Sequence, residues 1–345
     1  MRTGVTLAIL SWLWPLGAAA GQPEKPPRWL LATIAPEGSP SVVALRSVTQ
    51  LLTKSSGGQL GVSMRLGGIL GDEIDTLADC RTGAIQLCAV SIGALALQVP
   101  ELQFFEQPYL FRDLEAWTRT LVGYHYGTDP RLQSVVARHD LVLLGLTFIG
   151  WRNISSARRP IRSPGDLTGL RVRAQGSPLN LELWRAWGAI PKATALTELN
   201  SALEISLVEA FDVPSTFIFA SSLDARIKYY TVTRHVLQIG LLVANRKAWE
   251  ALPTQWKKHF FEGLPPLLAA GDREHTRFDQ ELVDLLPRRG VQIIRPDPDQ
   301  LAAFERAAAA AGESYLRRTA TPATLQLFDQ LRKAVSRSSG ARRQP

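Results

Sequence analysis

The strongest constraint on the fold is an alternation of short apolar segments with helix-like segments near the start of the chain. RWLLATIAP (28–36), GGQLGVSMRL (57–66) and AIQLCAVSI (84–92) each have the composition of a strand. Between them, Ser39 and Pro40 begin one segment with helical apolar spacing, and GDEIDTLADCRTG (71–83) is a second helix ended by Gly83. Strand, helix, strand, helix, strand predicts a parallel sheet with helices on its faces.

The chain changes character near Gly150. DLVLLGLTFIG (140–150) predicts a central strand buried on both faces, and the residues that follow, 151–169, are polar, basic and rich in turn formers. We therefore expect the chain to cross into a second domain there. A second α/β unit follows, with LRVRA (170–174), a helix over 177–187, a strand over 191–196 and a helix capped by Thr197.

The last third of the chain predicts long strands and then helices. Residues 229–249 are largely apolar and extended in character, and the return to the first domain is expected near His235. Pro265-Pro266 falls within a helical region, which it should break or kink.

The first 20 residues have the features of a secretory signal peptide. Arg2 precedes an apolar stretch, and the small residues AAA up to Ala20 provide a cleavage site. Pro15 makes the stretch too short for a retained membrane anchor. We expect export, cleavage after Ala20 and a soluble mature protein in the periplasm.

The formal charge of +8 would suit a nucleic-acid or membrane partner, but much of it lies outside the expected folded body. Without Arg2 and the basic residues of the segment 332–345, about +2 remains. The end of the chain, SRSSGARRQP (336–345), has no apolar periodicity and is expected to be a flexible tail. No nucleic-acid partner is expected.

Side chains that would indicate an enzyme or a metal centre are sparse. The five histidines have no metal-ligand spacing, and no phosphate loop or nucleophile motif is present in the sequence. Cys80 and Cys88 could form a disulfide in an oxidising compartment, although a late helical position and the following strand could hold them too far apart. We expect a binding protein without catalytic residues, cofactors or a metal.

Two arginines alternate along the LRVRA strand, so Arg171 and Arg173 should lie on the same side. They could both be solvated at a sheet edge, or one could lie in a cleft, because a buried arginine needs an anionic partner.

The sequence resembles the solute-binding proteins of tripartite ATP-independent periplasmic (TRAP) transporters, the DctP-like family. The resemblance is carried by RRPIRSPGDLTGLRVRAQGSP (158–178), WGAIP (187–191) and TELNSALEISLVEAFDVP (197–214), and upstream by GGILGDEIDTLADCRTGAIQL (67–87) and QPYLFRD (107–113). Matches extend in family order from about Leu31 to Pro253. The resemblance implies a two-lobed α/β fold, type II-like, with hinge strands and a ligand cleft between the lobes.

The resemblance also implies roles for particular residues. Arg173 matches the arginine that pairs with the ligand carboxylate, and Arg171 stands at a lysine position of the family. Arg152 matches a second arginine near the ligand, with a hinge salt bridge as the alternative. Ser91 matches a polar pocket residue or is simply a cap, and Glu73 matches the family's G-x-L-G-x-E motif or simply faces a helix dipole.

The chain departs from the family at its V-D-G-x-E-N motif, where it has VEAFDVP (208–214). Val213 replaces an amide, which disfavours a strongly polar sugar acid, and Trp151 and Phe211 suggest an apolar flank. Asp212 could help to hold a cation that bridges to the ligand. The candidate ligand-binding residues are Arg173, Arg152, Ser91, Trp151, Phe211, Asp212, Val213 and Leu196.

These expectations describe a receptor that captures a small organic acid and delivers it to a TRAP permease. The alternatives are a sensing or scavenging protein without a permease, and an exported enzyme on a similar two-lobed fold. The expected division places 21–149 and about 236–277 in the first lobe, and 150–235 and about 278–335 in the second.

Overall fold

The computed structural model describes residues 28–340. The predicted signal peptide and residues 341–345 lie outside the described residues. One nine-stranded sheet runs through the molecule in the order β2-β1-β3-β8-β4-β7-β5-β6, with β9 paired to β8. The strands are β1 (Arg28–Thr33), β2 (Gly61–Arg65), β3 (Leu87–Ser91), β4 (Leu141–Ser156), β5 (Arg171–Ala174), β6 (Ile190–Ala193), β7 (Ala210–Val213), β8 (Tyr229–Asn245) and β9 (Gln292–Ile294).

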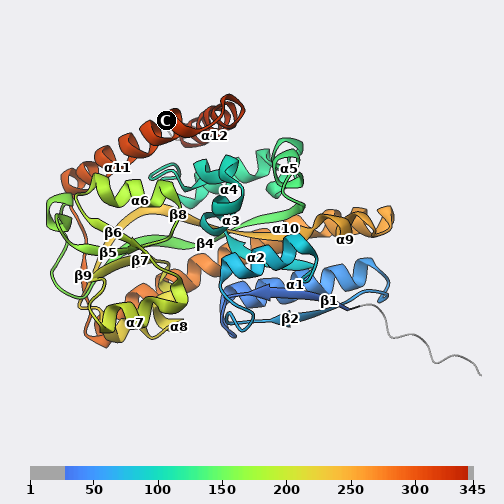
Figure 1. Ribbon diagram of the computed structural model, residues 1–345, viewed down its shortest axis with the longest axis horizontal. Helices are drawn as coiled ribbons and strands as arrows, with labels where there is room; N and C mark the ends of the chain where they lie inside the picture. Colours follow the sequence, from blue (N-terminus) through green and yellow to red (C-terminus); the bar gives the residue numbers. More distant parts are fainter. Residues whose placement is uncertain (1–27, 341–345) are drawn as a thin grey trace, which may run out of the picture.

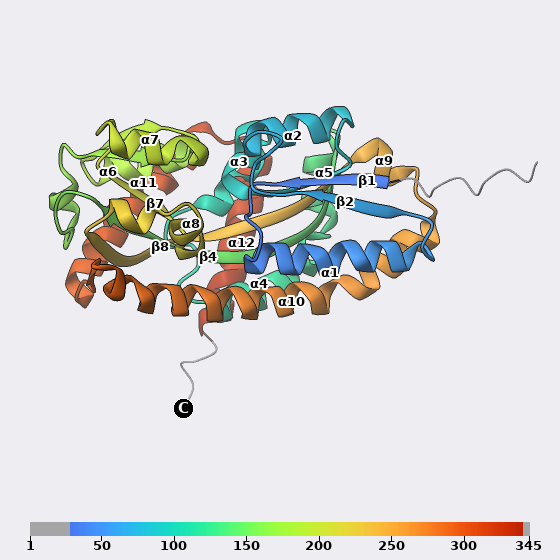
Figure 2. The same ribbon diagram turned by 90° about the horizontal axis from the view of Figure 1, so that it is seen from below.

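Helices cover the sheet on both faces (Figures 1 and 2). The α-helices are α1 (Pro40–Ser55), α2 (Glu73–Thr82), α3 (Ile92–Gln98), α4 (Leu114–Gly123), α5 (Pro130–Ala137), α6 (Pro178–Ala186), α7 (Leu199–Glu204), α8 (Ser215–Ala220), α9 (Arg246–Glu250), α10 (Thr254–Leu285), α11 (Pro298–Thr319) and α12 (Pro322–Gly340). No helix of the described part of the chain is long and apolar enough to span a membrane.

The predicted parallel unit is confirmed. β1 pairs in parallel with both β2 and β3. α1 begins where predicted, because the Ser39 side chain accepts a hydrogen bond from the Val42 N–H, and α2 ends at Gly83, which has a left-handed conformation (φ +89°). α1 and α2 lie on opposite faces of the sheet (Figure 2). We call this half of the molecule, with β1, β2 and β3, the first lobe.

Two long antiparallel strands, β4 and β8, connect the first lobe to a second lobe that contains β5, β6 and β7. The change of composition after Gly150 does not end the strand: β4 continues to Ser156. Gly150 has φ +137°, and the β4–β8 register shifts between Phe148 and Gly150. The two-lobed α/β class is therefore correct, and the crossing is a continuous strand with an irregularity at Gly150.

Two local expectations differ from the structure. Pro265-Pro266 does not break its helix: α10 continues through both prolines, although a proline inside a helix costs about 3 kcal/mol. Its apolar side chains Phe260, Leu264 and Leu268 are buried in one core cluster with residues of α1, and this packing holds the helix together. Thr197 does not cap a helix: it lies in a single 3-10 turn, and α7 begins at Leu199.

The C-terminal helices divide between the lobes. α11 packs on α6 of the second lobe, whereas α12 returns to α4 of the first lobe (Figure 1). Phe328, Leu331 and Val335 of α12 are buried in the same core cluster as Trp117 of α4. The expected second-lobe segment 278–335 therefore does not extend to α12, and residues 336–340, predicted as the start of a flexible tail, continue that helix.

Cys80 and Cys88 are both buried free thiols. The sequence allowed a disulfide between these two residues, and the structure has none between them.

Candidate functional site

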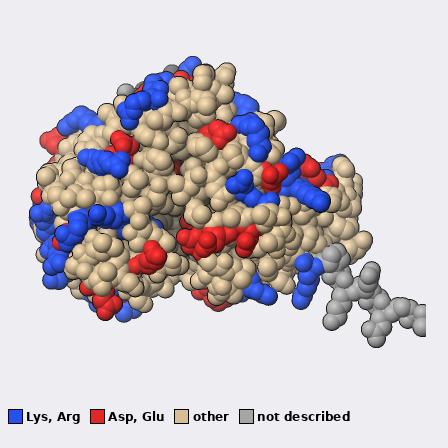
Figure 3. All heavy atoms as spheres, viewed as in Figure 1, with Lys and Arg blue, Asp and Glu red and all other residues tan. Residues whose placement is uncertain are grey.

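The candidate site is a cavity between the lobes with a volume of about 390 Å³, including space open to solvent. The face of the molecule seen in Figure 3 is hollowed where the two lobes meet. One wall is formed by the chain after β1 and the start of α2, and the other by the end of β5 and the chain after β6. Ligands of open α/β sheets bind outside the carboxyl ends of the strands, as here. The cavity is lined by Ile34, Asp72, Glu73, Ile74, Ala94, Arg173, Gln175, Ala195, Leu196 and Thr197.

Arg173 brings an unpaired positive charge into this cavity. It lies on β5 between β6 and β7 and is 5% exposed. Its Nε donates to the Thr194 carbonyl at 2.8 Å, and among residues 28–340 no carboxylate lies within salt-bridge distance of its guanidinium. Burial, and then the charge of Arg152, lowers the pKa of Arg173 to about 10. The guanidinium is thus charged at neutral pH, desolvated and without a counterion in the described protein.

Arg152, by contrast, is neutralised by the protein itself. It lies on β4, and its Nε and Nη2 donate to the two carboxylate oxygens of Asp212 at 2.7 Å each. Its Nη1 donates to the side-chain oxygens of Gln175 at 2.7 Å and Gln238 at 3.0 Å. Burial opposes the charge on Arg152, but the pair with Asp212 outweighs this effect and raises its pKa. Of the two alternatives for Arg152, the structure has the buried salt bridge.

Asp212 is fully engaged by protein groups. Besides Arg152, its Oδ2 accepts from Nε2 of His235 at 2.8 Å, and the Nδ1 of that ring meets the Thr233 hydroxyl at 2.8 Å. Burial lowers the pKa of His235, so the ring is neutral at pH 7. Against its own burial, Asp212 has a pKa below the ordinary range because Arg152 and His235 stabilise its charge. Both carboxylate oxygens already accept hydrogen bonds from Arg152 or His235, so the structure gives no support to a cation held by Asp212.

A hydrogen-bonded chain crosses the cleft from the first lobe to the second. Ser91 donates to Oε2 of Glu73 at 2.7 Å and accepts from Nε2 of Gln175 at 2.8 Å. Because the Gln175 oxygen accepts from Arg152, the chain connects Glu73 to the Arg152–Asp212 pair. Burial raises the pKa of Glu73 despite its hydrogen bonds from Ser91. Ser91 is thus both the cap of α3 and a polar residue of the cleft.

Residues 31–318 match the model of the family described as bacterial extracellular solute-binding protein, family 7, or DctP. The chain belongs to this family. It is 24% identical over 255 residues to the 2,3-diketo-L-gulonate-binding periplasmic protein YiaO of Escherichia coli, covering 73% of this chain and 76% of that protein. The resemblance to TRAP solute-binding proteins seen in the sequence is therefore confirmed.

Solved structures of this family have the same fold. The sugar acid binding protein DctPAm of Advenella mimigardefordensis, solved with galactonate, superposes with a TM-score of 0.82 at 21% identity over 90% of this chain and 99% of that chain. A TRAP periplasmic solute-binding protein of Ralstonia eutropha, solved with (S)-2-acetolactate, has a TM-score of 0.81 at 20% identity over 90% of this chain and 99% of that chain.

The predicted site residues do not all reach the cleft of this family 7 protein. Leu196 lines the cavity beside Arg173. Trp151, Phe211 and Val213 are instead buried in hydrophobic core clusters. On β7 the side chains alternate, so Asp212 faces Arg152 while its two neighbours face the core of the second lobe. The apolar flank inferred from Trp151 and Phe211 is not part of the cavity lining.

Two residues of the cleft region, Gln175 and Glu106, were not predicted from the sequence. Gln175 stands two residues after Arg173, and continuing the strand alternation would have placed it on the same side. Glu106 is the last residue of a 3-10 helix, η1 (Pro100–Glu106). No strand alternation in the sequence indicates its place near the cleft. Glu106 is buried, its Oε2 has no hydrogen-bond partner in the described protein, and burial raises its pKa. Gly93 leaves room for both, since a Cβ there would lie 2.4 Å from the Gln175 oxygen and 2.5 Å from a Glu106 oxygen.

Proposed function

We propose that the protein is the periplasmic receptor of a TRAP transporter, which binds a small organic acid through Arg173 and delivers it to a membrane permease. The observation that carries the proposal is the buried, unpaired guanidinium of Arg173 at the lobe interface. A cation held away from water is costly unless an anion accompanies it. A ligand carboxylate supplies that anion.

The family relationship supports a carboxylate as the recognised group. The named ligands of relatives include 2,3-diketo-L-gulonate, galactonate and (S)-2-acetolactate, which differ in length and hydroxyl content. What they share is a carboxylate. A planar guanidinium binds a carboxylate through two parallel hydrogen bonds, and the nitrogens of Arg173 other than Nε are available for this.

Arg152 has an indirect role in this proposal. Its donors are taken by Asp212, Gln175 and Gln238, so it fixes the second lobe and orients Gln175 toward Ser91. The N-terminal segment with signal-peptide features supports export to the periplasm.

The test compares two arginines of the same strand by titration calorimetry with galactonate, D-glucuronate and (S)-2-acetolactate. Arg173→Ala should weaken binding by about 2–5 kcal/mol, at least thirtyfold. Arg171→Ala is the matched control, because Arg171 is more exposed and paired with Glu209 at 3.3 Å, and its loss should cost less than about 1 kcal/mol. Unchanged affinity in folded Arg173→Ala protein contradicts the proposed site. Acid uptake by vesicles that contain the candidate permease tests delivery.

A further inference from the structure

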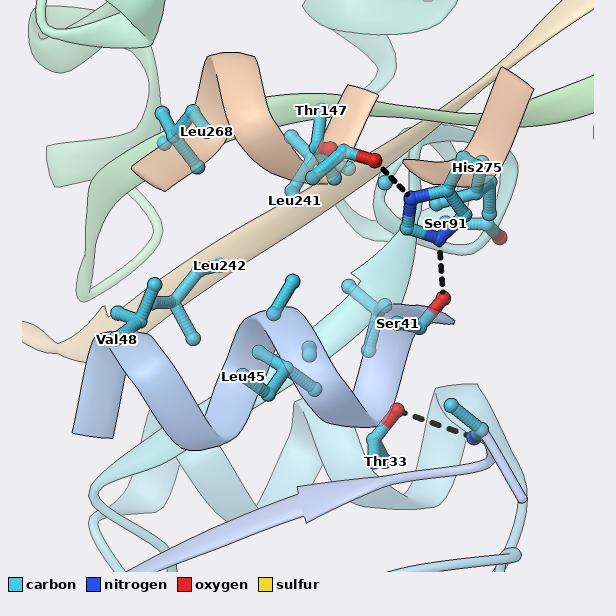
Figure 4. Close-up of a pocket in the computed structure, with 18 of the residues that line it drawn as sticks. Thr33, Ser41, Leu45, Val48, Ser91, Thr147, Leu241, Leu242, Leu268 and His275 are labelled. Carbon is cyan, nitrogen blue, oxygen red and sulfur yellow. Dashed lines mark hydrogen bonds between the residues drawn. The ribbon is translucent and has the colours of Figure 1, made fainter. Parts of the chain in front are cut away.

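A second cavity lies in the first lobe, between α1, α10 and the sheet, and has a volume of about 710 Å³ including space open to solvent (Figure 4). Its walls are largely aliphatic. The apolar lining side chains include Leu45, Val48, Ile149, Leu241, Leu242 and Leu268.

The polar side chains of this cavity are already hydrogen-bonded within the protein. His275 meets the Gly271 carbonyl through Nδ1 at 2.8 Å and the Ser41 hydroxyl through Nε2 at 2.8 Å (Figure 4). Because a carbonyl only accepts, Nδ1 carries the proton and Nε2 accepts from Ser41. The Thr147 hydroxyl donates to Asp272 at 2.7 Å. A ligand hydroxyl placed here would lose its bonds to water without gaining equivalent partners.

The cavity is not closed by the surrounding core. Ala89 and Ile149 belong to interior strands of the sheet, yet both remain partly exposed, because their side chains border this space. Small residues keep it open, among them Ala44 on α1 and Gly271 on α10. Protein interiors are normally close-packed, so an apolar space of this kind favours an apolar occupant.

The cavity meets the Arg173 site. Ile34 and Glu73 line both spaces. Ser91 lines the apolar cavity and accepts a hydrogen bond from Gln175, which lines the Arg173 cavity. The two cavities therefore adjoin, and a ligand that spans their shared wall would have its charged end at Arg173 and its other end against α1 and α10.

We infer that the ligand is a carboxylic acid with an apolar tail, whose carboxylate pairs with Arg173 and whose tail occupies the cavity between α1, α10 and the sheet. This inference rests on the proposed function. It narrows the expected ligand from a small organic acid to an acid with an apolar tail. It separates this protein from relatives solved with polyhydroxylated acids such as galactonate.

A homologous series of ligands tests the inference. Titration calorimetry with straight-chain carboxylates from propanoate to nonanoate should show affinity rising about fourfold per added methylene until the cavity is filled. Galactonate and D-glucuronate should bind more weakly than the longer chains.

Variants that fill the apolar cavity test whether the ligand tail binds there. Ala89→Leu should flatten the chain-length series and leave propanoate affinity unchanged, because the added side chain fills the cavity away from Arg173. Ala44→Leu fills the same cavity from α1. It replaces Ala89→Leu in the test if the Ala89→Leu protein does not fold. Ala310→Leu is the matched control, since Ala310 is an exposed residue of α11 that lines neither cavity.

The outcomes separate the two proposals. A flat series, or tighter binding of galactonate than of nonanoate, overturns the apolar-tail inference and leaves the receptor proposal standing if Arg173→Ala abolishes binding. The same holds if both cavity-filling variants keep the wild-type series. If no acid of either kind binds the wild-type protein, the receptor proposal fails, and the apolar-tail inference fails with it.

Discussion

Arg152 and Arg173 make an instructive pair. Both are buried, and both lie on strands that pair with β7. Arg152 has Asp212 as an internal counterion and two glutamine oxygens as further acceptors, whereas the guanidinium of Arg173 donates only to the Thr194 carbonyl within residues 28–340. The surroundings raise the pKa of Arg152 and lower that of Arg173. An arginine has a structural role where the fold supplies its counterion, as for Arg152. It is suited to bind an anionic ligand where no carboxylate of the described residues pairs with it, as for Arg173.

The largest effect should come from removing the internal anion. Asp212→Ala leaves Arg152 buried without a carboxylate, so the free energy of unfolding should fall by about 3–5 kcal/mol, measured by urea denaturation at pH 7. The double variant Arg152→Met with Asp212→Leu is the control and should lose less, because neither charge of the pair remains buried. A loss below about 1 kcal/mol for Asp212→Ala would show that the two arginines do not differ as described.

A smaller effect should follow from keeping the charge of Arg173 but changing its shape. Arg173→Lys removes the planar pair of donors, so affinity for the acid should fall about tenfold, or 1.4 kcal/mol, with no loss of unfolding free energy. Calorimetry with the acid that binds the wild-type protein most tightly measures this change, and thermal melting checks the fold. Wild-type affinity in the lysine variant would mean that a point charge suffices.

The smallest effect concerns pH. Binding of a carboxylate requires the protonated guanidinium, and the pKa of Arg173 in the free protein is about 10. Affinity should therefore be constant from pH 7 to 9 and then fall as pH rises through that value, by about fourfold at pH 10.5. Arg152, with its raised pKa, stays charged in this window. Calorimetry at pH 7.5 and 10.5 measures the change, with melting curves at both values as the control; equal affinities argue against Arg173 as the carboxylate partner.

Much of the fold could be predicted from the sequence, because its signals are local. The Ser39 cap and Gly83 set helix ends within a few residues of themselves, and the strand–helix alternation set the parallel unit of the first lobe. Predictions from local sequence signals failed where packing between segments that are distant in the sequence had the larger effect. α10 passes through Pro265 and Pro266 because its buried face packs against α1, and β4 passes Gly150 because β8 pairs with it on both sides of that residue.

By itself, the sequence determined the family and the two-lobed α/β class, and it predicted Arg173 as the leading site residue. Only the tertiary structure decided which arginine is free. The Arg152–Asp212 pair joins residues 60 positions apart, and the strand pairing that brings them together also turns Phe211 and Val213 into the core. The apolar cavity likewise depends on α1 and α10, which are distant in the chain and adjacent in space (Figure 2). Periodicity and capping act within a few residues, whereas counterions and cavities arise from side chains that meet only after the chain has folded.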